Sequence, residues 1–279
     1  MEDNEKLTHY LYGHEKEMLS LWKTLVETES GPKQPTGVES VRSLLAGELA
    51  AMGFTIRLQK VSGAPDLLIA ERGKEEGEGP IILSGHMDTV FPEGKASTCP
   101  FFIDEEGYAH GPGVLDMKGG LVVSLYAVKA LSALSLVTPP IKFVFVTDEE
   151  TLHMHSNAKA VLRREITGAK AFLNFEPCAE NGQVVLSRYG GGPVSIHVHG
   201  CAAHSGTSPE KGRSAILEAA HKIIYLESKN DISRGKLINC GAIDGGIGEN
   251  TIPGECTLRI GVRYRTESLC LLYTSDAAD

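Results

Sequence analysis

Four short segments of the sequence carry histidine and acidic residues at spacings that suit metal binding. In the first, Ser84-Gly-His-Met-Asp, His86 and Asp88 are two residues apart, so their side chains share a face of a strand or of its exit. A carboxylate beside a histidine fixes the tautomer of the ring and raises its basicity as a metal ligand. Taken alone, the pair is also typical of an ordinary histidine that is satisfied by a neighbouring aspartate.

The second segment is the glycine-rich run Gly111-Pro-Gly-Val-Leu-Asp-Met-Lys-Gly-Gly, which surrounds Asp116 just before a helix expected from about Met117. Glycines let the backbone approach a ligand closely, and the helix dipole favours a carboxylate at a helix N-terminus. An ordinary N-capping aspartate would give the same pattern, and the segment by itself slightly favours that alternative.

The last two segments place acidic residues at the ends of apolar runs. Thr147-Asp-Glu-Glu follows the run 141–146, and Glu176 in Asn174-Phe-Glu-Pro follows the next run. Adjacent carboxylates repel one another unless a cation compensates them, and ligands bind outside the carboxyl ends of strands in open α/β sheets. A surface charge run and a solvated turn residue are the respective alternatives.

Together the four segments supply one imidazole and several carboxylates from successive elements. This set suits zinc, or manganese or cobalt, with coordination positions left for water. Two metals that share a carboxylate would also use these ligands and would activate a bridging water. The sequence therefore predicts a metal centre with an activated water.

Helices and apolar strands alternate in the first part of the chain. Helices are expected in residues 6–27, 38–52, 117–134 and 156–165, and strands in residues 55–61, 66–70, 80–84, 141–147 and 169–175. The last two strands are almost continuously apolar, which is typical of burial on both faces. Residues 73–79 contain only Gly, Lys and Glu and predict an exposed hairpin tip. The pattern predicts an α/β domain with helices on both faces of a mixed sheet.

The pattern changes after about residue 181 and predicts a smaller α+β domain. Strands with clearer alternation are expected in residues 184–188, 193–199, 236–244 and 255–264, with one amphipathic helix in residues 214–227. In Val194-Ser-Ile-His-Val-His the apolar residues fall on one face and the polar residues on the other. Such a sheet is covered by the helix on one side.

Composition excludes several classes of protein. The 279 residues carry 27 Lys and Arg against 36 Asp and Glu, and the net charge of −9 without a basic cluster disfavours a nucleic-acid partner. No apolar run approaches the roughly 18 residues of a membrane span, and the acidic N-terminus lacks the apolar core of a secretory signal. The six cysteines are scattered without a Cys-x-x-Cys pair, as expected of reduced thiols in a cytoplasmic protein.

The order of these motifs resembles that of the zinc aminoacylase and carboxypeptidase superfamily, which includes glutamate carboxypeptidases of the carboxypeptidase G type, acetylornithine deacetylase and succinyl-diaminopimelate desuccinylase. The resemblance extends from about residue 15 to Arg265 and is carried by Gly-x-Gly-x-x-Asp-Met-Lys-Gly-Gly and the following Asp-Glu-Glu. It implies a zinc-exopeptidase-like catalytic domain with a mixed sheet in residues 1–183. It also implies a ferredoxin-like lid and dimerisation domain in residues 184–268.

The resemblance implies a site with two zinc ions, with cobalt or manganese as alternatives. Its implied members are His86 and Glu176 as ligands of one zinc, Asp116 as the bridge, Glu150 as a ligand of the other zinc, Asp88 as the residue that orients His86, and Glu149 as the general base. The family often has a cis peptide bond after the bridging aspartate, here Asp116–Met117, which is unusual where no proline follows.

The second domain supplies further candidates through the same resemblance. Ala203-His-Ser-Gly resembles the stretch whose histidine reaches across the dimer to polarise the substrate carbonyl, which nominates His204. The segments around Asn250 and Arg263 resemble segments that contact substrate. A turn residue and a solvated strand charge are the alternatives for these two. The planar fork of an arginine suits a free α-carboxylate.

The implied function is hydrolysis of an amide bond in a small peptide or N-acyl amino acid with a free carboxylate, as in a carboxypeptidase or dipeptidase. The alternatives are an N-acyl amino acid deacylase of the same superfamily and a non-catalytic relative that serves binding or assembly. Retention of Glu149 favours an enzyme, because a binding module needs no general base. We expect the full-length protein to form a homodimer through the lid.

Three features depart from the family pattern. The last zinc-binding histidine of the family normally follows the lid, but no histidine follows His221 here. Residues 269–279 match no lid pattern, and we interpret them as a non-native tail of a gene fragment. An inactive, poorly soluble chain with about one zinc or fewer is therefore expected. His153 and His155 replace a Gly-Ser turn of relatives, and we interpret them as surface residues or as an edge of the pocket.

Overall fold

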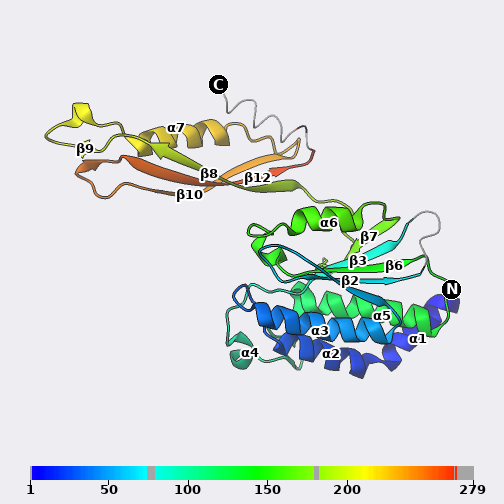
Figure 1. Cartoon of the computed structure of the whole chain (residues 1–279). Helices are drawn as coiled ribbons and strands as arrows, with labels where there is room; N and C mark the ends of the chain where they lie inside the picture. Colours follow the sequence, from blue (N-terminus) through cyan, green and yellow to red (C-terminus); the bar gives the residue numbers. More distant parts are fainter. Residues whose placement is uncertain (1, 74–78, 179–181, 267, 269–279) are drawn as a thin grey trace. The chain divides into compact units, whose positions relative to one another are not determined.

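The computed structural model describes residues 2–73, 79–178, 182–266 and 268 (Figure 1). The chain divides into two compact units, residues 1–180 and 181–279. The tail at residues 269–279 lies outside the described residues, as does most of the hairpin tip expected at residues 73–79. Among the described helices, none has the length and apolar character needed to cross a membrane.

A five-stranded mixed sheet forms the centre of the first unit, which confirms the α/β fold expected from the sequence. The strand order is β1-β2-β6-β3-β7, in which β3 runs parallel to both β6 and β7, and β2 runs antiparallel to β1 and β6. The strands are β1 (Thr55–Gln59), β2 (Leu67–Arg72), β3 (Ile81–His86), β6 (Ile141–Val146) and β7 (Ala171–Asn174).

Helices cover both faces of this sheet (Figure 1). The helices of the first unit are α1 (Glu2–Gly13), α2 (Glu15–Glu27), α3 (Pro35–Ala51), α4 (Lys95–Thr98), α5 (Gly120–Ala133) and α6 (Ala158–Ile166). Leu68 and Phe143 pack with α2, α3 and α5 on one face, whereas Leu67 and Val144 pack with α6 on the other. Because successive strand residues point to opposite faces, the sheet needs apolar residues at consecutive positions, and β6 is buried along its whole length.

Three expectations for the first unit were wrong. The expected helix 6–27 is two helices that meet at His14, where the backbone leaves the helical region and Nδ1 of the ring contacts the Tyr10 carbonyl oxygen at 2.8 Å. The strands flanking residues 73–79 form no hairpin, because β6 lies between β2 and β3. The strand near residues 169–175 is not buried on both faces: β7 is an edge strand, and Phe172 is 43% exposed.

The second unit contains a three-stranded antiparallel sheet covered by one helix. The sheet has the order β10-β12-β8, with strands β8 (Gly190–His199), β10 (Lys236–Gly245) and β12 (Glu255–Tyr264), and the helix is α7 (Ala215–Glu227). Val198, Leu258 and Ala219 lie in the core between sheet and helix. Ser214 caps α7, since its hydroxyl accepts a hydrogen bond from the Leu217 amide at 3.1 Å.

The prediction of a strand at residues 184–188 was wrong. These residues belong to no strand, and Val184 and Leu186 are 78% and 93% exposed. An apolar run becomes a strand only where a partner strand supplies hydrogen bonds, and the described residues offer none here. Four short strands complete the structure: β4 (Phe102–Ile103) pairs with β5 (Ala109–His110), and β9 (Ala203–His204) pairs with β11 (Thr251–Ile252).

A charged cluster joins β1, β6 and α6 of the first unit near the N-terminal end of β6. Glu165 on α6 accepts hydrogen bonds from Arg57 at 2.8 Å and makes an ion pair with Lys142 at the same distance. Burial alone would raise the pKa of Glu165, but these two cations outweigh it and lower the pKa below its ordinary value of 4.5. The carboxylate therefore stabilises the fold at pH values above 4.5, and this contribution is lost as the pH falls through the lowered pKa.

Glu165→Gln is expected to lower the free energy of unfolding by roughly 2 kcal/mol at pH 7, because it removes hydrogen bonds to charged groups. The difference between variant and parent should shrink as the pH falls below 4.5. Urea titrations at pH 7 and at pH 4 and below measure both quantities. A difference that stayed constant or grew on acidification would contradict this account of the cluster.

Candidate metal centre

Three of the expected metal ligands converge at the carboxyl end of the first sheet. His86 ends β3, Glu176 follows β7, and Asp116 lies in the turn η1 (Val114–Gly119) that precedes α5. Because β3 and β7 are parallel neighbours, their carboxyl ends meet at one edge of the sheet. One potential ligand atom from each of the three residues lies within 4.8 Å of the others.

The hydrogen bonds of His86 leave one ring nitrogen facing carboxylates. Its Nδ1 lies 2.9 Å from the Asp88 carbonyl oxygen, which can only accept, so Nδ1 carries the proton. Its Nε2 lies 2.9 Å from Asp116 Oδ1 and 3.6 Å from Glu176 Oε1. A neutral ring in this tautomer would point the Nε2 lone pair at two acidic side chains, and this becomes favourable when Nε2 binds a proton or a metal ion.

The charges around His86 favour that cation. Burial lowers the pKa of His86, but Asp88, Glu176 and Asp116 outweigh burial and raise the pKa to about 10. An environment that holds a proton this strongly also attracts a metal ion at the same nitrogen, because both compensate the same carboxylates. Three protein ligands is the number that open catalytic zinc sites use, and imidazole nitrogens and carboxylate oxygens are both donors that zinc accepts.

Asp88 holds the acidic turn in addition to facing His86. Its carboxylate lies 3.5 Å from His86 Nδ1 and accepts hydrogen bonds from the amides of Glu149 and Glu150 at 3.2 and 3.0 Å. These two residues open the turn η2 (Glu149–Thr151), which directly follows β6. Sequence reasoning assigned Asp88 only to His86 and missed this second contact, for which residue spacing gives no signal.

Glu150 shares the electrostatic environment of the cluster. Burial is the main cause that raises the pKa of its carboxyl to about 7, and Asp116, Asp88 and Glu149 raise it further against the opposing effect of His86. Glu150 is not among the three residues whose ligand atoms lie within 4.8 Å of one another. The structure thus places Glu150 at the margin of the triad formed by His86, Asp116 and Glu176.

The glycine-rich segment positions Asp116 by an irregular turn, in which Asp116 and Met117 have non-helical backbone angles, and by close packing around that turn. The peptide bond between Asp116 and Met117 is cis, as the resemblance implies. The Met117 sulfur lies 3.0 Å from the His86 amide, and a Cβ on Gly85 would lie 2.5 Å from the Met117 methyl carbon. A Cβ on Gly120 would lie 2.0 Å from the Phe175 carbonyl oxygen. Neither η1 nor α5 has a side-chain cap, so the N-capping interpretation of Asp116 is wrong.

His204 and Asn250 lie together in the second unit. The pairing of β9 with β11 sets Thr251 opposite His204, and the Ser205 amide donates to the Asn250 carbonyl oxygen at 2.9 Å. Nδ1 of His204 accepts from the amides of Gly206 and Thr207 at 3.1 and 3.3 Å. The ring proton therefore lies on Nε2, which is the tautomer that can donate to a carbonyl oxygen.

Arg263 lies at the opposite end of the same unit. It is near the end of β12, opposite Gly191 of β8, whereas the His204 loop adjoins the Glu255 end of β12. Glu255 and Arg263 are eight residues apart, which corresponds to about 26 Å along a strand. The structure thus brings His204 and Asn250 together and keeps Arg263 apart from both.

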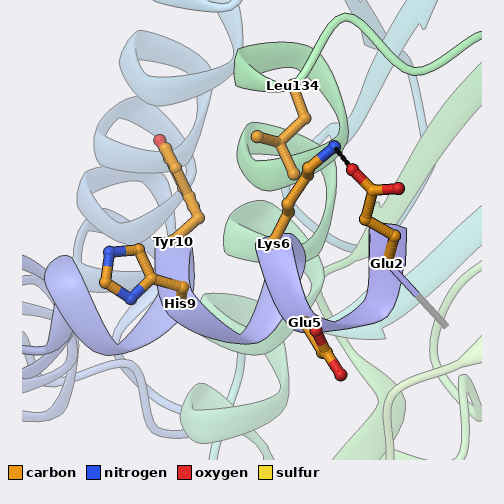
Figure 2. A pocket seen from close by; sticks show the side chains of 6 residues that line it. All are labelled: Glu2, Glu5, Lys6, His9, Tyr10 and Leu134. Carbon is orange, nitrogen blue, oxygen red and sulfur yellow. Dashed lines mark hydrogen bonds and ion pairs between the residues drawn. The ribbon is translucent and has the colours of Figure 1, made fainter.

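The remaining candidates and a groove beside α1 lie elsewhere. His153 contacts Asp148 at 2.6 Å, and the described residues include no metal-ligating group that contains His153 or His155. A groove of about 450 Å³ is lined by α1 and by Leu134 at the end of α5 (Figure 2). None of its lining residues belongs to the triad or to the substrate candidates, so this groove does not identify the site.

Fold and site together define a class: an α/β unit with a mixed sheet, at whose carboxyl edge His86, Asp116 and Glu176 could hold a metal ion. Residues 82–260, more than half of the chain, match the model of the peptidase family M20/M25/M40. The chain belongs to this family, whose enzymes are metal-dependent hydrolases.

Individual relatives support the same assignment. The chain is 31% identical over 246 residues to carboxypeptidase G2 of Pseudomonas sp. strain RS-16, covering 86% of this chain and 58% of the relative. It is 32% identical over 245 residues to acetylornithine deacetylase of Pasteurella multocida, covering 79% of this chain and 59% of the relative. The chain thus spans just under three fifths of the length of these two relatives.

Solved structures share the fold. The aminopeptidase PepT of Bacillus cereus matches with a TM-score of 0.74 at 24% identity, covering 90% of this chain and 67% of that one. An M20 family metallo-carboxypeptidase, Sso-CP2 of Sulfolobus solfataricus, matches with a TM-score of 0.67 at 13% identity, covering 89% and 71%. At these identities the likeness concerns the fold alone.

Proposed function

We propose that the protein is a zinc-dependent hydrolase that cleaves an amide bond in a small peptide or N-acyl amino acid with a free carboxylate. The carrying observation is that His86 Nε2 faces the carboxylates of Asp116 and Glu176 at 2.9 and 3.6 Å, the position in which a metal ion would replace the proton on that nitrogen. His86 and Glu176 would hold one zinc, Asp116 would bridge to a second, and Glu150 would bind the second. Cobalt or manganese would suit the same donors.

When bound, the metal would polarise the substrate carbonyl and lower the pKa of the attacking water. Glu149 is the proposed general base: its carboxylate takes the proton from the water as the carbonyl carbon is attacked, then returns the proton to the leaving amine. Asp88 positions this turn, because it binds the backbone amides of Glu149 and Glu150. The same carboxylate faces His86 and holds the ring orientation.

The substrate class follows from Arg263 and from the names of the relatives. A guanidinium binds a carboxylate through two parallel hydrogen bonds, which suits the free carboxylate of a peptide or an acyl amino acid. The relatives named above are a carboxypeptidase and an acetylornithine deacetylase, so a deacylase is the second candidate. A relative that only binds is disfavoured because both the triad and Glu149 are present.

The position of Arg263 supports an assembly of two chains. A dipeptide spans at most about 7 Å, but Arg263 and the His204 loop are about 26 Å apart along β12. If both groups contact one small substrate, they must come from different copies of the chain. We therefore propose that residues 1–183 form the catalytic domain and that residues 184–268 form a lid through which two chains associate, with His204 acting across the dimer.

Mixed dimers test the proposed role of His204. In a version of the protein that spans the full length of its relatives, subunits with Glu149→Gln and subunits with His204→Ala are each expected to be inactive. Mixing them should restore up to about a quarter to a half of the parent activity after subunit exchange, because one of the two sites in a hybrid is intact. Exchange is verified by mass spectrometry of the dimers. Absence of recovery in a verified hybrid would place His204 in its own chain's site or outside the mechanism.

A substrate panel tests the function itself. Dipeptides, N-acyl amino acids and the same compounds with an amidated carboxyl group are assayed with added zinc, using a version of the protein that spans the full length of its relatives. We expect hydrolysis only of compounds with the free carboxylate, and Arg263→Gln should raise KM for these more than it lowers kcat. Equal rates for carboxylate and amide forms would contradict the proposed substrate class, while the metal site would remain to be tested separately.

A further inference from the structure

The segment between α2 and α3 contacts both loops that carry the proposed metal site. Lys118, two residues after Asp116, donates a hydrogen bond from Nζ to the Thr28 carbonyl oxygen at 2.7 Å. The Thr89 amide, next to Asp88, donates to the Ser30 carbonyl oxygen at 2.9 Å. Residues 28–30 therefore hold two loops whose contacting residues, Thr89 and Lys118, are 29 residues apart in the sequence but lie beside the proposed metal site.

Lys118 is an unusual residue for this position. It is 1% exposed and is among the largest of the fully buried side chains. Lysine is almost never fully buried without a partner, and an apolar side chain of similar volume would avoid the desolvation of the ammonium. Burial lowers the pKa of Lys118 to about 7, against the opposing effect of Glu29, whose carboxylate is fixed by the amides of Gly94 and Ala96 at 2.9 and 2.8 Å. Whatever its charge, the buried Nζ needs the Thr28 carbonyl oxygen as its hydrogen-bond partner, and this requirement specifies the position of the side chain.

A second contact lies beside the first. Within the described part of the chain, Ser30 Oγ is the buried side-chain atom without a hydrogen-bond partner. It lines a cavity of about 10 Å³ together with Lys118 and Thr89. That volume corresponds to one water molecule, which needs polar partners of the kind that the hydroxyl and the ammonium supply.

We propose that Lys118 is a positioning residue for Asp116: its Nζ fixes the turn to residues 28–30 through the hydrogen bond to Thr28 and through one buried water at Ser30. The inference rests on the proposed metal site, because Asp116 has a function only if that site binds metal. Lys118 itself does not touch the metal or the substrate. It acts by holding the Asp116 carboxylate at 2.9 Å from His86 Nε2.

The test is zinc affinity, measured by competition with a chromogenic chelator, in the unmodified chain and in variants. Lys118→Met is expected to weaken zinc binding by roughly 10- to 100-fold, as loss of a residue that orients a ligand does. The d–d spectrum of bound cobalt should also change. Lys142→Met is the matched control: Lys142 is buried and paired with Glu165 and Glu71, but it lies at the other end of β6 from the triad. It should lower Tm without changing zinc affinity.

Ser30→Ala provides a second test, because the expected change in Tm has opposite signs with and without a bridging water at Ser30. If a water joins Ser30 to Lys118, the variant should lower Tm and weaken zinc binding several-fold, in the same direction as Lys118→Met. If the hydroxyl is simply unsatisfied, its removal should leave Tm unchanged or raise it, with zinc affinity intact. Should Lys118→Met not fold, Ser30→Ala decides the question.

The outcomes separate the inference from the proposed function. Zinc binding by the unmodified chain that depends on His86 supports the metal site, and if Lys118→Met then binds zinc within twofold of the parent, the inference alone is overturned. A spectrum of bound cobalt that is identical in parent and Lys118→Met would overturn it as well. Absence of zinc binding in the unmodified chain would overturn the proposed metal site and this inference with it.

Discussion

Glu149→Gln is expected to lower the turnover number by a factor of about 100 or more in an active preparation, with the zinc content unchanged. The amide of glutamine cannot take a proton from water, so the step assigned to the carboxylate is lost. The backbone amide of residue 149 still donates to Asp88, so the turn should remain in place. Steady-state kinetics with parallel elemental analysis measure both quantities.

Glu150→Gln is the control for this prediction. It alters the neighbouring carboxylate on the same turn, and because Glu150 is a proposed ligand, this variant should lose metal as well as activity. If Glu149→Gln kept near-normal turnover, or if it lost zinc to the same extent as Glu150→Gln, the assignment of Glu149 as general base would be wrong.

His86→Ala is expected to weaken zinc binding by more than the roughly 10- to 100-fold that changes around a ligand cause, because it removes a ligand itself. The variant leaves the carboxylates of Asp116 and Glu176 facing one another without the imidazole between them. Competition with a chelator gives the zinc affinity, and circular dichroism reports whether the fold persists.

The matched control for His86→Ala is His110→Ala. His110 also contacts a carboxylate, Asp104 at 2.6 Å, but in the hairpin of β4 and β5 and outside the triad. Its loss should leave zinc affinity unchanged. Equal losses of affinity in the two variants would indicate that zinc binds nonspecifically to histidine–carboxylate pairs.

The central strands and the convergence of the triad could be predicted from sequence because both depend on local pattern. The apolar run that forms β6 has no other stable placement than between two covered faces, and an acidic triplet directly after it must lie at the carboxyl edge. The same argument predicts that His86, at the end of β3, lies at this carboxyl edge. Parallel neighbours then bring the ends together without any further information from the sequence.

The errors arose where a pattern is local but its outcome depends on distant partners. The expected hairpin failed because β6, which pairs with both β2 and β3, enters from a segment about 60 residues later. The runs at β7 and at residues 184–188 are apolar, yet one lies at a sheet edge and the other pairs with no described strand. Apolar composition does not report the number of neighbours that a strand has.

The contacts of Asp88 and Lys118 could not be predicted for a related reason. Each joins its own loop to a backbone group of another: the Asp88 carboxylate to the amides of residues 149 and 150, and the Lys118 ammonium to the Thr28 carbonyl oxygen. Backbone groups are present at every residue, so no residue type marks the partner. Side-chain candidates such as His204 and Asn250 were found because the motif itself names them.

Diffraction from crystals grown with zinc, recorded above and below the zinc absorption edge, tests the central claim most directly. The account predicts an anomalous peak about 2.0–2.2 Å from His86 Nε2, with carboxylate oxygens of Asp116 and Glu176 at similar distances. Glu150 should approach a second peak, if one is present, on the far side of Asp116. A crystal that holds zinc at other histidines, such as His197 and His199, with no peak at His86 Nε2 would contradict the assignment of the metal centre.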